Sequence, residues 1–67
     1  MITYAVKRIN LKHINTVDEY WNAVKNATIH YCNGIIELKE YCGGMLHRER
    51  NGYSGTNGNI MYIAEKV

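Results

Sequence analysis

The start of one helix is marked clearly in this chain of 67 residues, and it limits what the rest can form. Residues 16–19, Thr-Val-Asp-Glu, make a capping box: the Thr16 hydroxyl accepts from the Glu19 N–H, and the Glu19 carboxylate can reach back. Asn33-Gly34 is a stop signal. We therefore predict a helix from Val17 to Cys32. Its apolar stripe consists of Val17, Tyr20, Trp21, Val24, Ala27, Thr28 and Tyr31.

Strands are predicted on both sides of this helix. Ile2, Tyr4 and Val6 alternate with polar or small residues, which indicates a half-buried strand. Ile9 and Leu11 continue on the other parity, so either a bulge near Lys7-Arg8 corrects the phase or the strand ends there. Further strands are predicted over 35–41, 45–50 and 60–67, and residues 42–44 form a turn.

These elements predict one α+β domain over residues 1–67. An amphipathic helix must cover a surface, and one face of an antiparallel sheet provides it. We expect a single helix packed on a four-stranded, mainly antiparallel sheet in the order β-α-β-β-β, with the last three strands as a meander. The segment Asn51–Asn59 carries three glycines and is expected to be either one mobile loop or two close turns around Tyr53-Ser54. If it is a loop, it either has a function or is simply a flexible hairpin end.

Composition excludes several classes of protein. Eight Lys and Arg against six Asp and Glu give a net charge of +2, which suits neither an acidic nucleic-acid mimic nor a histone-like binder. No apolar run approaches the roughly 18 residues of a membrane span, and the N-terminal sequence is too mixed for a signal peptide. We therefore expect a cytoplasmic protein whose Cys32 and Cys42 are free thiols.

The histidines and cysteines provide the residue types of a zinc site, namely His30, Cys32, Cys42 and His47. Their spacing is wrong for a finger, because structural zinc sites favour paired short knuckles. Neither cysteine lies in a recognisable nucleophile signature with a histidine base and an orienting third residue. We expect no metal, no cofactor and no enzymatic activity.

Basic residues form two candidate contact edges. One edge combines Arg48 and Arg50 with Tyr53 and Asn57, because Tyr and Arg are favoured interface anchors. The second edge consists of Lys7, Arg8 and Lys12. Basic residues interleaved with tyrosine also suit phosphate contacts and base stacking, so direct nucleic-acid binding stays open.

The outward face of the predicted helix is poor in charge. It carries Asn22, Lys25, Asn26, Ile29 and His30. A solvated helix usually shows more charged pairs, so this face is either a partner surface or an ordinary Asn-rich surface.

The small size, the element order and the absent catalytic set resemble small phage-encoded anti-CRISPR proteins that inhibit type I surveillance complexes. The resemblance implies a stoichiometric inhibitor that docks on a larger nucleic-acid-binding protein or ribonucleoprotein complex. The leading hypothesis is accordingly a non-enzymatic inhibitor or adaptor that binds a larger protein. The alternative is a small nucleic-acid-binding module, and exposed edge strands would also allow a homodimer.

Overall fold

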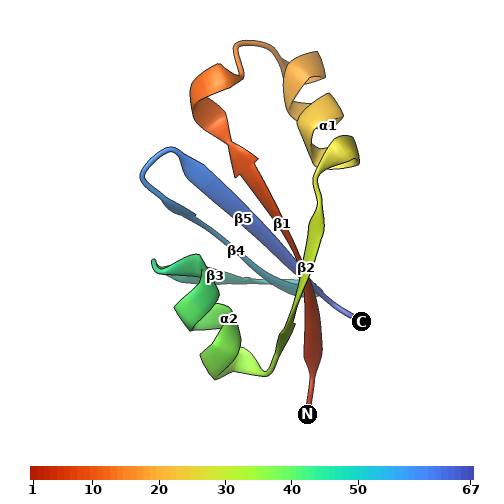
Figure 1. The fold of residues 1–67 in the computed structure, drawn as a ribbon, viewed down its shortest axis with the longest axis vertical. Coiled ribbons are helices and arrows are strands. Elements are labelled where there is room, and N and C mark those ends of the chain that lie inside the picture. Colours follow the sequence, from red (N-terminus) through yellow and green to blue (C-terminus); the bar gives the residue numbers. More distant parts are fainter.

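The computed structural model describes residues 1–67 as an α+β domain with a five-stranded antiparallel sheet and two helices (Figure 1). The predicted class is confirmed, whereas the predicted four strands and single helix are wrong in number. In chain order the elements are β1 (Thr3–Asn10), a 3-10 turn η1 (Leu11–His13), α1 (Val17–Asn26), β2 (Ile29–Asn33), α2 (Ile35–Cys42), β3 (Leu46–Glu49), β4 (Gly52–Asn57) and β5 (Ile60–Lys66).

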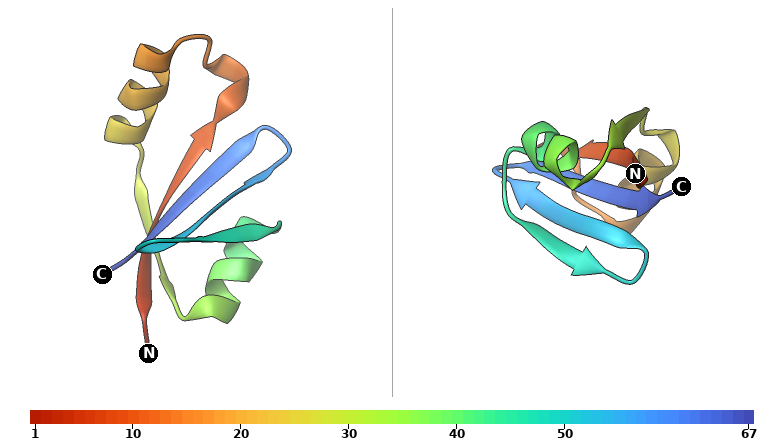
Figure 2. Two further views of the ribbon diagram at one scale, coloured as in Figure 1. Left: turned by 180° about the vertical axis from the view of Figure 1, so that it is seen from behind. Right: turned by 90° about the horizontal axis from the view of Figure 1, so that it is seen from below.

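The strands lie in the order β2-β1-β5-β4-β3, so the last strand of the chain is the middle of the sheet. The final three strands form a meander, but not from the predicted segments 35–41, 45–50 and 60–67, because 35–42 is a helix and 52–57 supplies the middle strand. β1 inserts between β5 and β2. Figure 2 shows α2 lying over one face of the sheet. Neither helix is long or apolar enough to cross a membrane.

The first strand is buried on both of its faces, at different ends. Tyr4 and Val6 lie on the face that α2 covers, whereas Ile9 points to the opposite face and is also buried. Pairing with β5 runs unbroken along β1, so there is no bulge and the strand continues past Lys7-Arg8. The change of parity at Ile9 therefore marks a change in which face is covered.

The predicted long helix stops after ten residues, and its second half is a strand. α1 ends at Asn26, and Ile29–Asn33 becomes β2, paired antiparallel with β1. Thr28, Ile29 and Tyr31 are β-branched or aromatic, and such residues favour strands over helices. The edge of β1 supplies backbone partners for them, and these outweigh the weak helical spacing of this stretch.

The predicted strand over 35–41 is wrong, because this segment is helix α2. Ile35, Leu38 and Cys42 recur at helical spacing and pack against the sheet. Gly43 closes the helix in the left-handed conformation, with φ at +66°. The adjacent β-branched residues Ile35 and Ile36 resembled a short buried strand, but the Glu, Leu and Lys that follow are good helix formers.

The glycine-rich segment is mostly strand rather than loop. Residues 52–57 form β4, with two-residue turns before and after it. A Cβ at Gly52 or Gly55 would overlap a neighbouring carbonyl oxygen, of Ala64 or of Met45 respectively. These two glycines therefore allow the backbones of adjacent segments to approach closely, a role that the sequence pattern does not distinguish from flexibility.

The core lies between α2 and the sheet. Its seven buried residues are Tyr4, Val6, Cys32, Leu38, Cys42, Tyr62 and Ala64. The ring of Tyr41 lies edge-on to Tyr62, and Tyr53 lies edge-on to Tyr4, each with ring centroids 5.8 Å apart. α1 contributes none of these residues, because it packs at the far end of the opposite face.

Candidate binding surfaces

Exposed apolar side chains occur along both α1 and β2. Val17 is 70% exposed, Trp21 61%, Tyr31 57% and Ile29 44%. Figure 1 shows α1 passing directly into β2 at the same edge of the sheet. We refer to these four residues as the α1–β2 surface.

The helix part of this surface follows from how α1 packs. The Tyr20 hydroxyl lies 3.7 Å from the sulfur of Met61 on β5. The face of α1 that carries Tyr20 is therefore the one turned toward the sheet. Val17 and Trp21 are four residues apart and therefore share a neighbouring face of the helix. The Trp21 ring lies edge-on to Tyr20, with centroids 5.1 Å apart. The prediction that Val17, Trp21 and Tyr31 are core residues is wrong, because all three are exposed.

The strand part of this surface follows from alternation along β2. Cys32 points into the core beneath α2, so Ile29 and Tyr31 point to the opposite face of the sheet. β2 is an edge strand, and its five residues, Ile-His-Tyr-Cys-Asn, carry no Lys, Glu, Asp or Arg. Edge strands usually carry charges that discourage association, and this one does not.

The residues of the first predicted contact edge do not all lie together in the structure. Arg48 and Tyr53 are register partners on β3 and β4, and Arg50 follows in the turn between these strands. Tyr53 is half-buried against Tyr4. Asn57 lies at the opposite end of β4, where its amide donates to the carbonyls of Cys42 and Gly43 and ties β4 to the end of α2. The predicted edge therefore combined Asn57, whose amide has a structural role, with the exposed cations Arg48 and Arg50.

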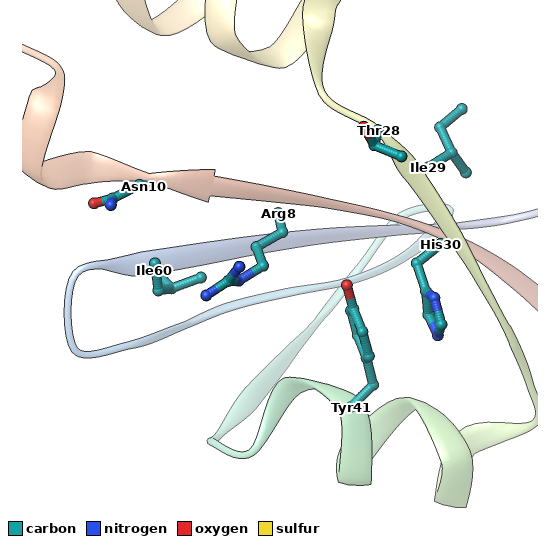
Figure 3. Close-up of a pocket in the computed structure, with 7 residues that line it drawn as sticks. All are labelled: Arg8, Asn10, Thr28, Ile29, His30, Tyr41 and Ile60. Carbon is teal, nitrogen blue, oxygen red and sulfur yellow. The ribbon is translucent and has the colours of Figure 1, made fainter.

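The second predicted edge is also divided. Lys7 and Arg8 are adjacent on β1 and so point to opposite faces of the sheet, and Lys12 is exposed on η1. Arg8 lies on the side of α2, where it lines an open hollow of about 420 Å³ (Figure 3). The other lining residues are Asn10, Thr28, Ile29, His30, Tyr41 and Ile60.

The four candidate zinc ligands do not form one cluster. Cys32 and Cys42 are both buried in the core, whereas His30 is exposed and stacks on Tyr41, with ring centroids 4.0 Å apart. His47 lies on β3, at the opposite edge of the sheet from His30. No group of three or more His, Cys, Asp or Glu side chains is placed to hold a metal ion.

Both thiols are shifted toward the protonated form. Burial, with a smaller contribution from the neighbouring Cys32 thiol, raises the pKa of Cys42 to about 11. Burial also raises the pKa of Cys32, as does the Glu37 carboxylate. A reactive cysteine needs a lowered pKa and access to solvent, so these thiols have the properties of core residues.

The comparisons identify no relative: no protein-family model matches the chain, and no curated protein or solved structure matches it significantly.

Proposed function

We propose that this protein is a non-enzymatic binding module, an inhibitor or adaptor that docks on a larger protein through the α1–β2 surface. The observation that carries the proposal is Trp21, the single tryptophan of the chain, held 61% exposed on a helix none of whose residues is fully buried. Tryptophan is the residue type most enriched among interface anchors, because it buries a large apolar area at small entropic cost.

The surface area of the whole molecule supports docking. It exposes 4908 Å², against roughly 4,300 Å² expected for a compact protein of its mass. A standard interface takes roughly 800 Å² from each partner, so one such contact would cover about a sixth of this surface. A contact that covers α1 and β2 would bury apolar area that the fold itself leaves in water.

An apolar, uncharged surface favours a protein partner over nucleic acid. Its four residues, Val17, Trp21, Ile29 and Tyr31, supply no cation, whereas phosphate backbones are bound mainly by Lys and Arg. An anti-CRISPR-type inhibitor, docked on a nucleic-acid-binding effector complex in a host cytoplasm, is one specific form of this proposal. The proposal does not depend on that form, because the resemblance assumed one helix and the chain has two.

A pull-down with matched variants tests the proposal. The tagged protein would be incubated with bacterial lysate with and without nuclease, and its partners identified by mass spectrometry. Trp21→Ala removes the central anchor. Ile36→Ala is the control, because Ile36 is an equally apolar, 73% exposed residue on the outer face of the other helix.

We expect a stoichiometric protein partner that survives nuclease, is retained by Ile36→Ala and is lost with Trp21→Ala. With the purified partner, Trp21→Ala should weaken binding by at least about thirtyfold, the typical loss for a hot-spot residue. Equal binding by both variants would overturn the assignment of the surface. Partners that disappear with nuclease would favour the alternative, a nucleic-acid-binding module that uses the basic edges.

A further inference from the structure

The hollow beside α2 contains hydrogen-bond donors that the fold does not use. Its floor comes from β1 and β5, and its walls from Thr28, from the start of β2 and from Tyr41 on α2 (Figure 3). The hollow contacts the α1–β2 surface at Ile29 and otherwise lies on the other side of the sheet. It therefore requires a separate explanation.

Two of these donors are unengaged. In Figure 3 the Arg8 side chain runs along the floor toward Ile60, and the Tyr41 hydroxyl points into the hollow beside it. None of the side-chain hydrogen bonds within the chain involves either residue. Tyr41 is held in place by His30, stacked parallel on its ring, and by Tyr62, which packs edge-on.

A third donor is oriented by the backbone. The Asn10 side-chain oxygen accepts from the Lys12 N–H at 3.0 Å. That contact occupies the oxygen and leaves the amide nitrogen free to donate. Arg8 and Asn10 are two residues apart on β1, so both side chains lie on the same face of the strand.

No carboxylate lines the hollow, so its residues favour a ligand with negative charge. Its seven residues supply one permanent cation, one imidazole and neutral polar groups, with Ile29 and Ile60 as apolar walls. The Arg8 guanidinium and the Tyr41 hydroxyl line the hollow from β1 and α2, which are separate elements, whereas the Asn10 amide lies at its far end and points away from both (Figure 3). A phosphate group presents oxygens in several directions and accepts from such a set, and Arg is the preferred phosphate ligand.

We propose that this hollow is a binding site for a phosphate monoester, with Arg8 as the anchor and Tyr41 as an additional donor. Its volume of about 420 Å³ leaves room beside the phosphate for an organic body, and it lies within the size range of small-molecule sites. Two sources share this chemistry, a free nucleoside monophosphate and the 5′-phosphate of a nucleic-acid strand.

The experiment is a ¹H–¹⁵N NMR titration at neutral pH and constant ionic strength. Inorganic phosphate is the first probe, with chloride as the reference anion. Adenosine monophosphate and a dinucleotide with or without a 5′-phosphate then distinguish the two sources. Arg8→Gln removes the anchor, and Lys7→Gln is the matched control, because it removes the adjacent cation on the opposite face of β1. Tyr41→Phe removes the hydroxyl but keeps the ring stacked on His30.

We expect saturable shifts around Arg8 and Tyr41 with phosphate and none with chloride. Arg8→Gln should weaken binding at least about tenfold, and Tyr41→Phe by a smaller factor of about three, as the loss of a charged and of a neutral hydrogen bond implies. Lys7→Gln should bind as the unaltered protein does. Shifts that do not saturate, or equal losses in Arg8→Gln and Lys7→Gln, would show general charge attraction and overturn the site.

Discussion

Cys42 is the residue whose burial has the most direct consequence for stability. Its pKa rises from 9.0 to about 11 in the folded protein. The folded state therefore keeps this proton at pH values where the unfolded chain has lost it. By linkage, the associated stability is present below pH 9 and is lost as the pH rises from 9 to 11, by at most about 1.4 kcal/mol per pH unit.

Urea denaturation at a series of pH values measures this slope. Cys42→Ala should flatten it, although the variant is less stable at every pH because it loses core contacts. Cys32 keeps its own, smaller contribution. An unchanged slope in Cys42→Ala would assign the alkaline loss to other titrating groups. Native-state thiol reagents should react slowly with both cysteines and rapidly after unfolding.

At the scale of single residues, local hydrogen bonding could be predicted from the sequence, whereas the exposure of individual side chains could not. The Thr16 cap is confirmed, with its hydroxyl accepting from the Glu19 N–H at 3.1 Å, because capping depends on neighbours in the chain. Trp21 was predicted to be buried and is not. Which side of a helix faces a sheet depends on where the helix lies, and α1 lies at the end of the sheet rather than over its centre.

Among the elements, α1 should be sensitive to the loss of its cap. Thr16→Ala removes both the N–H contact and the 3.2 Å bond from the hydroxyl to the Glu19 carboxylate. We expect a loss of about 1 kcal/mol. It should appear as faster amide exchange in residues 17–26, since no residue of α1 is fully buried. Unchanged exchange there would mean that packing on Met61, rather than the cap, fixes the helix.

Substitution should destabilise the protein much more at Gly55 than at Gly58. Gly55→Ala places a methyl group against the Met45 carbonyl, so we expect a loss of about 2 kcal/mol or more, measured by urea denaturation. Gly58 has φ at +63° with open space around it. Asn tolerates this conformation, so Gly58→Asn should stay within about 1 kcal/mol of the parent. Similar losses at both sites would contradict the close approach at Gly55.

The elements show where sequence patterns suffice. The helix start was predictable, because cap signals are local. The meander was predicted with one wrong strand, because 35–41 is helical and the glycine-rich segment 52–57 is the strand between β3 and β5. The division between α1 and β2 was not, because Ile29–Asn33 becomes a strand through pairing with β1, more than twenty residues earlier in the chain. α2 was predicted to be a strand because a short apolar run is compatible with the residue spacing of both a helix and a buried strand. The hollow beside α2 could not be predicted, since Arg8 and Tyr41 line one hollow only once α2 exists.

For the whole molecule, protection from solvent should fall from the centre of the sheet toward α1. β1 and β5 have strands on both sides and contribute most of the buried core. Hydrogen–deuterium exchange followed by NMR should find the slowest amides in these two strands and the fastest ordered amides in α1. Equal protection of α1 and β5 would contradict the peripheral position of the helix. Binding of a protein partner should slow exchange in α1 and β2 selectively.

The position of β5 also determines when this protein can fold. Residues 60–66 are made after the other four strands, yet they join the β1–β2 pair to the β3–β4 pair. A two-stranded pair alone is marginal in water, so neither half is stable before β5 is available to join them. Folding of the sheet must therefore wait until β5 has been made, and a chain cut short before Ile60 loses the centre of its sheet rather than an end.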